Sequence, residues 1–254
     1  MTARDKRLHA QLQEDLAALK LNYFLEHYAE TLDEAARKNT SMLEVLSLLA
    51  GGEASDRAEK AMQRRINQAR LPKRKTLEEY DFNFPRKIPK QKVLRLFDCE
   101  FIEKYGCAVL VGGTGTGKSH LLTALGYVAC EKGIKVRFTR TIDMINVLTT
   151  AQLNGTLEKK LREYVRPELL LLDELGYLPI DKRGADLMFQ VVAARYEAGS
   201  IVVTTNRKFS EWGKIFDVDN TLATAMIDRL MHHGEAITIE GKSYRTNENN
   251  DSDS

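Results

Sequence analysis

The segment 112–119 has the residue types and spacing of a phosphate-binding loop, G-x-x-x-x-G-K-[S/T], because it reads Gly112-Gly113-Thr114-Gly115-Thr116-Gly117-Lys118-Ser119. An expected strand (107–111) precedes it and an expected helix (117–132) follows it. Glycines let backbone N–H groups approach a phosphate, and the helix N-terminus adds partial positive charge. We therefore predict an ATP site in which Lys118 reaches the β- and γ-phosphates and the Ser119 hydroxyl ligates Mg²⁺. His120 adjoins the loop and is counted with it, although a structural role is its simpler interpretation.

Two adjacent carboxylates end an apolar run further along the chain. Leu169-Leu170-Leu171-Leu172 predicts a buried strand, and Asp173 and Glu174 follow it directly. Because burying charge is costly, carboxylates at this point favour a catalytic role. Asp173 can hold the Mg²⁺ shell, and Glu174 can polarise a water molecule against the γ-phosphate. The pair favours nucleotide hydrolysis over a small-molecule P-loop kinase, and Glu174 argues against a scaffold that binds ATP without hydrolysing it.

A third polar element follows the expected strand at 201–205 and ends in Asn206. Thr-Thr-Asn by itself would indicate only a turn. If this strand lies between the strand before the loop and the strand before Asp173, then Asn206 faces the γ-phosphate and the attacking water. We therefore group Asn206 with Lys118 and Glu174 as catalytic candidates.

These elements, together with Asp228-Arg229-Leu230, resemble the AAA+ ATPases of the helicase-loader and initiator group. More narrowly, residues 8–245 resemble the IstB-like transposition helper ATPases of bacterial insertion sequences. The narrower features are Arg70-Leu71-Pro72, the sequence Thr-Leu-Glu-Glu-Tyr-Asp-Phe at 76–82, Asp-Glu-Leu-Gly-Tyr at 173–177, Glu211-Trp212 and Gly241-Lys242-Ser243-Tyr244-Arg245.

The resemblance implies an α/β fold: an AAA+ P-loop ATPase core with a parallel sheet flanked by helices, preceded by a small helical domain and without a C-terminal lid. It implies ATP hydrolysis, a homo-oligomer with ATP between subunits, and double-stranded DNA and the transposase of the same insertion sequence as partners. Asn206 would be a sensor of the γ-phosphate, and Arg229 an arginine finger donated to a neighbouring subunit, with Arg195 as second choice. The role of Arg245 stays open. A DnaC-type helicase loader, which shares every motif, is the alternative function.

The DNA contacts are predicted from length and charge. Segment 141–167 is longer than a minimal crossover, and the initiator group lines a nucleic-acid channel with an insertion there. Basic residues in or next to this segment are candidates for phosphate contacts that do not depend on base sequence, and the candidates are Arg140, Lys159, Lys160 and Arg162. Residues 57–95 hold thirteen Lys and Arg against four Asp and Glu, so segment 64–75 is the alternative DNA surface. A solvated face is the competing interpretation for each residue.

Composition excludes several classes of protein. The chain has 254 residues, of which 43% are hydrophobic and 29% charged, so it is not wholly disordered. No apolar run approaches the roughly 18–20 residues that cross a bilayer, and residues 1–7 are polar. Cys99, Cys107 and Cys130 are widely spaced and are expected to be free thiols in a reducing compartment. We therefore expect a cytoplasmic protein without a membrane segment.

Periodicity and turn residues divide the chain into a helical domain (1–70), a basic and aromatic linker (71–90), the ATPase domain (91–246) and a disordered acidic tail (247–254). Ser41-Met42-Leu43-Glu44 predicts a capping box, and the helix that it opens is expected to stop at Gly51-Gly52. A helix is expected over about 91–105, and a long helical region is expected over 142–165. His232-His233 before Gly234 is expected to complete a helix end, because no further metal ligand is evident beside it.

Overall fold

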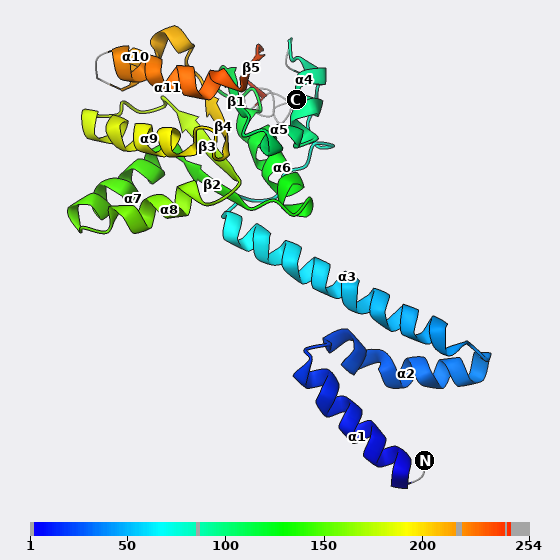
Figure 1. The fold of residues 1–254 in the computed structure, drawn as a ribbon. Helices are drawn as coiled ribbons and strands as arrows, with labels where there is room; N and C mark the ends of the chain where they lie inside the picture. Colours follow the sequence, from blue (N-terminus) through cyan, green and yellow to red (C-terminus); the bar gives the residue numbers. More distant parts are fainter. Residues whose placement is uncertain (1–2, 85–86, 217–219, 242, 245–254) are drawn as a thin grey trace, which may run out of the picture. The chain divides into compact units, whose positions relative to one another are not determined.

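The computed structural model describes residues 3–84, 87–216, 220–241 and 243–244. The chain divides into two compact units, Met1–Arg64 and Arg65–Ser254, which are taken separately below (Figure 1). In the described part of the chain, no helix is long and apolar enough to cross a membrane. The predicted tail at 247–254 and Arg245 lie outside the described residues.

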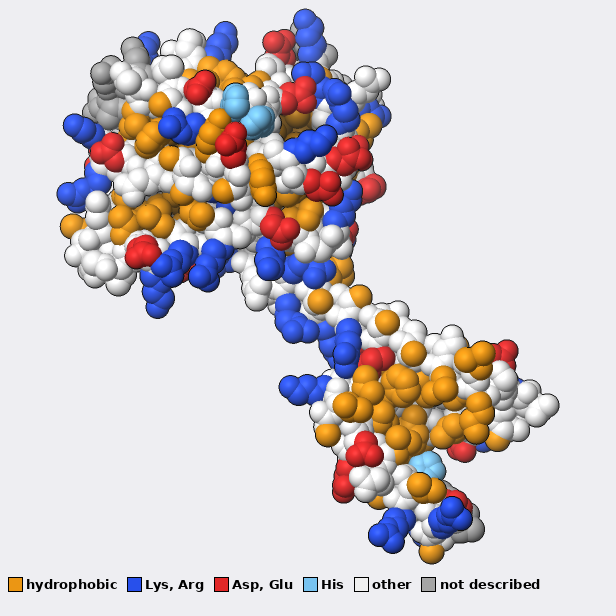
Figure 2. Space-filling model, in the orientation of Figure 1, with side chains coloured by type: hydrophobic (Ala, Val, Ile, Leu, Met, Phe, Trp, Pro, Cys, Tyr) orange, Lys and Arg blue, Asp and Glu red, His pale blue; other side chains and the backbone are white. Residues whose placement is uncertain are grey.

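The first unit consists of α1 (Ala3–Ala18), α2 (Asn22–Lys38) and the first part of α3 (Met42–Ala69). Its small core contains Leu16, Tyr28, Val45 and Leu49. The capping box before α3 is confirmed, because Glu44 N–H donates to Ser41 Oγ and the Glu44 carboxylate accepts from Ser41 N–H. Leu8, Leu12 and Leu19 of α1 and the turn after it are exposed, and Figure 2 shows further apolar side chains on the surface of this unit.

The prediction that a helix stops at Gly51-Gly52 is wrong, because α3 continues through both glycines. The two positions differ in their surroundings. A Cβ on Gly52 would lie 2.0 Å from the Tyr23 ring, whereas a Cβ on Gly51 would meet nothing within 4 Å. Gly52 therefore gives α2 room to pack against α3, and nearby the buried Glu53 accepts from Tyr23 N–H at 2.9 Å.

The second unit is built on a five-stranded parallel sheet in the order β2-β3-β4-β1-β5. The strands are β1 (Cys107–Gly112), β2 (Val136–Arg140), β3 (Leu169–Leu175), β4 (Ser200–Thr205) and β5 (Gly234–Ile239). The main helices are α4 (Lys90–Phe97), α6 (Lys118–Glu131), α7 (Thr141–Leu153), α8 (Leu157–Val165), α9 (Lys182–Arg195) and α11 (Asn220–His232). Short helical turns are α5 (Glu100–Glu103), η1 (Phe209–Glu211) and α10 (Trp212–Ile215).

Alternating side chains of the strands supply two hydrophobic cores, one on each face of the sheet. Leu170, Leu172 and Val203 pack with α7, α8, α9 and α11, whereas Leu169 and Leu171 pack with α4, α5 and α6. All four leucines of the run are fully buried, which explains why it shows no polar alternation. This two-sided burial confirms the α/β sheet with helices on both faces.

Two expected helical regions are each divided in two, so the prediction of one helix over 91–105 is wrong in detail. The region 91–105 divides into α4 and α5 at Cys99, which has φ 63°. The region 142–165 divides into α7 and α8 near Gly155, which has φ 67°. The expected linker also packs closely: Leu71, Leu77 and Phe82 lie against the core beside α6.

We expect Gly52→Ala to lower the free energy of unfolding by about 1–3 kcal/mol, because the added methyl group forces the Tyr23 ring to move. The matched control is Gly51→Ala, which should be neutral or stabilising by up to about 1 kcal/mol through helix propensity. Chemical denaturation followed by circular dichroism measures both values. Equal effects of the two substitutions would contradict the packing described for α2 and α3.

Candidate functional site

The phosphate-loop sequence forms the turn between β1 and α6. Gly115 and Gly117 have φ of 76° and 86°, a left-handed conformation that glycine adopts without steric cost. A Cβ on Gly117 would also lie 2.5 Å from the ring of Tyr80. Backbone conformation therefore requires glycine at both positions, and the close approach of Tyr80 requires it a second time at Gly117.

Polar contacts hold the loop in shape. Lys118 Nζ donates to the carbonyl oxygens of Gly112 and Gly113 at 2.8 and 2.6 Å. Thr116 Oγ1 donates to Gly113 O at 2.9 Å, and Tyr244 N–H donates to Gly115 O at 2.9 Å. The ammonium group predicted to bind phosphates thus lies over the loop itself.

The carboxylate of Asp173 is the buried charge of the site, with only 6% of the residue exposed. Its Oδ1 accepts a hydrogen bond from Ser119 Oγ at 2.9 Å and a short one from Thr204 Oγ1. The backbone carbonyl of Asp173 accepts from Thr141 Oγ1 at 3.0 Å. Three hydroxyl groups from α6, β4 and the start of α7 therefore meet at the end of β3.

Glu174 lies beside Asp173 in an unusual backbone conformation. Its φ is 59°, and between Leu172 and Leu175 the register of β3 against β4 shifts by one residue. A bulge of this kind redirects a side chain, and a non-glycine residue with positive φ at a strand end is typical of a functional site. Glu174 N–H donates to Thr204 Oγ1 at 2.9 Å, and the side chain is exposed. Thr204 therefore positions both acidic residues.

A cavity of about 760 Å³ adjoins these groups. Residues 115–120, Asp173 and Glu174 line it. Its aromatic lining comes from Tyr80 and Phe84 of the expected linker (71–90) and from Tyr244 near the C-terminus. Burial raises the pKa of Tyr80 to about 12, so its hydroxyl stays protonated and donates to Thr116 O at 3.1 Å. The size and the mixture of polar and aromatic lining are those of a small-ligand site.

His120 connects α6 to the segment before it. Its Nε2 lies 2.6 Å from Thr76 O, and its ring contacts Tyr80 edge to face. Thr76 and Glu79 exchange reciprocal hydrogen bonds through their side chains and backbone N–H groups. The histidine therefore lines the cavity and also fixes the aromatic segment in place.

The donor atoms at the end of β3 suit Mg²⁺. Ser119 Oγ and Asp173 Oδ1 are 2.9 Å apart, and both are oxygen donors of the kind that this hard cation prefers. These two residues are the ligands that the sequence predicts, and the structure brings them together across 54 positions of sequence.

The structure places Asn206 at the end of β4 and Arg229 on α11. The strand β4 does lie between β1 and β3, as the role of Asn206 requires, and Asn206 is exposed directly after it. Arg229, half-buried on α11, donates from Nη1 to Ala225 O at 3.0 Å, and its guanidinium lies 4.8 Å from the centre of the Phe189 ring. Neither side chain lines the described cavity.

The second choice for an arginine finger, Arg195, is wrong. Its side chain is buried, with 1% exposed, and donates to the carbonyl oxygens of Tyr164, Val165, Pro167, Glu168 and Ser200. Burial lowers its pKa to about 10, which still leaves it charged at neutral pH. Arg195 ties α9 to the segment before β3 and to β4, and it has no exposed group to offer another subunit.

The four predicted DNA-contacting residues lie at the end of β2 and on α8. Arg140 forms two hydrogen bonds with Asp143 at 2.7 and 3.0 Å, Lys160 pairs with Glu163, and Arg162 pairs with Glu158. Exposed pairs of this type contribute little to stability, so phosphates can compete for the cations. Figure 2 shows Lys and Arg side chains gathered over α8, where Lys159 is exposed.

Comparison with known proteins assigns the family. A family model for IstB-like ATP binding proteins matches residues 14–252. The chain belongs to this family. An ATP-binding protein of insertion sequence IS21 from Pseudomonas aeruginosa is 38% identical over 94% of this chain and 89% of its own length. A counterpart in insertion sequence IS232 from Bacillus thuringiensis subsp. berliner is 35% identical over 94% of this chain and 96% of its own length. The resemblance inferred from the motifs is confirmed.

Solved structures place this IstB-like chain in the AAA+ fold. AMPPCP-bound DnaA from Aquifex aeolicus superimposes with a TM-score of 0.56 at 24% identity, over 67% of this chain and 51% of that chain. The DnaC helicase loader superimposes with a TM-score of 0.53 at 22% identity, over 65% of this chain and 96% of that chain. This chain therefore spans about half of DnaA, and the likeness shows the fold. The protein is an ATP-binding AAA+ P-loop protein.

Sequence reasoning missed Thr141, and it grouped Thr204 with Asn206 without predicting the contact of Thr204 with Asp173. Tyr80 was expected beside the adenine base or in the core, but its contact with the phosphate loop was not predicted. A threonine inside a buried strand is a signal that the sequence does contain, because a buried hydroxyl group needs a hydrogen-bond partner. Which partner it has depends on strand order, which one sequence does not reveal. The Tyr80 contact depends on the path of the segment before α4.

We expect Thr204→Val to lower the free energy of unfolding by about 1–3 kcal/mol, because the Asp173 carboxylate loses a donor and Glu174 N–H loses its acceptor. Thr204→Ser, which keeps the hydroxyl, is the matched control and should lose less stability and keep its affinity for Mg²⁺–ATP. Denaturation and equilibrium nucleotide binding measure the two effects. If the valine and serine variants bind Mg²⁺–ATP equally well, Thr204 does not position the carboxylates.

Proposed function

We propose that this IstB-like protein hydrolyses ATP to ADP and phosphate, binds double-stranded DNA as a homo-oligomer, and assists the transposase of its insertion sequence in target selection and insertion. The supporting observation is the pair of carboxylates at the end of β3. Asp173 contacts the hydroxyl group of the phosphate loop, whereas the adjacent Glu174 is exposed and lines the same cavity. The two acids thus have different surroundings, which supports a metal-binding role for Asp173 and a proton-accepting role for Glu174.

In the proposed reaction, Lys118 and the backbone N–H groups of residues 113–118 bind the β- and γ-phosphates. Ser119 and Asp173 would hold Mg²⁺, and the ion would offset negative charge on the phosphates. A Glu174 carboxylate oxygen takes a proton from water as the water oxygen bonds to the γ-phosphorus. The bond from that phosphorus to the bridging oxygen breaks, and Asn206 orients the water from the end of β4.

Arg229 is proposed to act on the ATP of a neighbouring subunit. Arg229 is half-buried on α11, its guanidinium lies over the ring of Phe189 of α9, and the residue does not line the cavity of its own chain. A guanidinium donated in trans stabilises charge that develops on the γ-phosphate. This role makes hydrolysis depend on assembly, so ATP between subunits couples the oligomer to the nucleotide.

The DNA contacts are proposed for Arg140, Lys159, Lys160 and Arg162. Arg140 is the one closest to the nucleotide site, because it lines a second cavity of about 500 Å³ together with Asp173 and Glu174. Arg70 and Arg137 line this cavity as well. Phosphate contacts by such residues bind DNA through counterion release and carry little sequence preference.

A transposase partner is favoured over a replicative helicase. The insertion-sequence relatives match 94% of this chain, including its helical first unit, whereas the DnaC helicase loader matches 65%. We further propose that residues 1–70 form a domain of their own. We also propose that the protein is cytoplasmic, where ATP and DNA are available to it. A transposase gene adjacent to the gene for this protein supports the helper, and an adjacent replication gene supports the loader.

A mixing experiment tests the finger in trans. Arg229→Ala should bind ATP through its intact loop but hydrolyse it poorly, since such fingers contribute about 10³–10⁵ in rate. Lys118→Ala should lose ATP binding while keeping its finger. Because each variant supplies what the other lacks, mixing them should restore part of the ATP turnover. If mixed oligomers form and turnover stays absent, Arg229 is not the finger.

DNA binding should be strongest with ATP and should weaken steeply as salt rises. Replacing Lys159 and Arg162 by Ala should lower the slope of log K against log salt by about 1 for each lost phosphate contact. The matched control is Lys38→Ala, which removes an exposed helical cation paired with Glu34 in the first unit. Fluorescence anisotropy of a labelled duplex measures the slope. An unchanged slope in the α8 variant would exclude these residues as the DNA contacts.

A further inference from the structure

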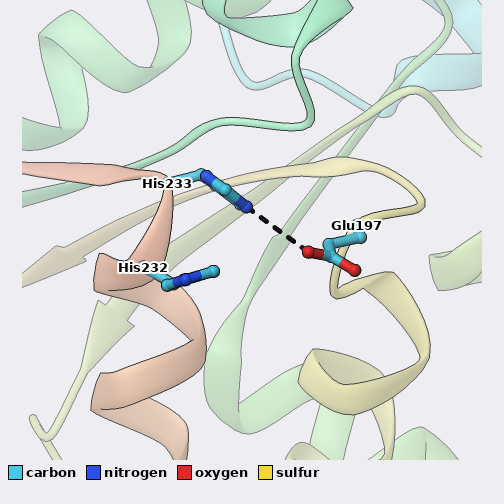
Figure 3. A group of neighbouring side chains, drawn as sticks. All are labelled: Glu197, His232 and His233. Carbon is cyan, nitrogen blue, oxygen red and sulfur yellow. Dashed lines mark hydrogen bonds and ion pairs between the residues drawn. The ribbon is translucent and has the colours of Figure 1, made fainter.

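Two adjacent histidines and a glutamate from another element meet at the surface of the second unit. His232 ends α11, His233 directly precedes β5, and Glu197 lies in the turn between α9 and β4 (Figure 3). The ends of α11 and α9 are thereby brought together, although 35 positions of sequence separate Glu197 from His232. None of the three residues has a role in the nucleotide site described above.

The donor atoms of this cluster converge. One ring nitrogen of each histidine and a carboxylate oxygen of Glu197 all lie within 4.8 Å of one another, and His233 Nε2 is 3.5 Å from Glu197 Oε1. Bonds of about 2.0–2.1 Å in a tetrahedral zinc site place ligand atoms roughly 3.3 Å apart. All three side chains are exposed, so they can close the remaining distance by rotation without disturbing the core.

The chemistry of the donors selects the class of ion. Two imidazole nitrogens and one carboxylate oxygen form a set that suits Zn²⁺ and similar transition-metal ions, whereas Mg²⁺ prefers oxygen donors alone. Three protein ligands leave one position of a tetrahedral site open to water. The sequence offered only the two adjacent histidines; the third ligand becomes visible once the fold is known.

Tyr196 supplies an outer contact of the kind that metal sites use. Its hydroxyl lies 2.8 Å from His232 Nδ1. When a histidine binds a metal through Nε2, its Nδ1–H donates to a nearby oxygen, which fixes the tautomer and the ring orientation. Tyr196 is positioned to accept that hydrogen bond. The four residues therefore provide three ligands and a group that orients one of them.

We propose that Glu197, His232 and His233 form a binding site for one Zn²⁺-class ion. The ion would link the C-terminal end of α11 to the turn that follows α9. Arg229 lies on α11 three residues before His232 and contacts Phe189 of α9. The site thus joins the same two helices as the Arg229 contact, and its occupation stabilises their packing.

Calorimetric titration of the full chain with ZnCl₂, without nucleotide, tests this site. Wild-type protein should bind one Zn²⁺ there, and His232→Gln, His233→Gln and Glu197→Gln should each weaken binding at least about tenfold. Tyr196→Phe should weaken it by about 10–100-fold through the lost outer contact. His27→Gln in the first unit is the matched control and should leave the Zn²⁺ affinity unchanged, and MgCl₂ should not displace the ion.

Thermal unfolding supplies a second measurement. Zn²⁺ should raise the midpoint for the wild-type protein and for His27→Gln, but not for Glu197→Gln, whose exposed side chain can change without affecting folding. Absence of Zn²⁺ binding by the wild-type protein would overturn the proposal. So would equal Zn²⁺ affinity in the wild-type protein and the two histidine variants, because the ion would then bind elsewhere.

Discussion

The hydrogen bonds to the buried carboxylate of Asp173 are the constraint on which the rest of the nucleotide site depends. A charge with this little exposure is stable only where donors replace the lost water, and Ser119 and Thr204 provide them. Ser119 belongs to the phosphate loop and Thr204 to a neighbouring strand. The carboxylate therefore holds three segments in register at one edge of the sheet.

The strand order makes these contacts possible. Since β4 lies between β1 and β3, the carboxyl ends of all three strands meet at the same edge, with the loop after β1 beside the acids after β3. The bulge at the end of β3 gives the two acids different surroundings. Asp173 contacts the hydroxyl cluster, while Glu174, which has a positive φ, is exposed and lines the cavity. Burial of both sheet faces supplies the rigidity that this arrangement needs.

The parts that the sequence predicted are those coded by short, continuous patterns. The loop 112–119, the leucine run before Asp173 and the capping box at Ser41 each depend on neighbours in the chain. Contacts between distant segments were not predictable: Thr204 with Asp173, the burial of Arg195 among five carbonyl groups, and the approach of Glu197 to two histidines. Gly52 shows the same limit, because a glycine can end a helix or give a neighbouring ring room, and only the position of Tyr23 decides.

Asp173 and Glu174 are proposed to have separate tasks in one ATP site, and nucleotide turnover by a single variant tests this division. ATP binding and steady-state hydrolysis should be measured together for Glu174→Gln, with Lys118→Ala as the reference for a disabled loop. Glu174→Gln should keep its ATP affinity and lose turnover, because only the proton acceptor for water is removed. Equal loss of ATP affinity in both variants would contradict this division.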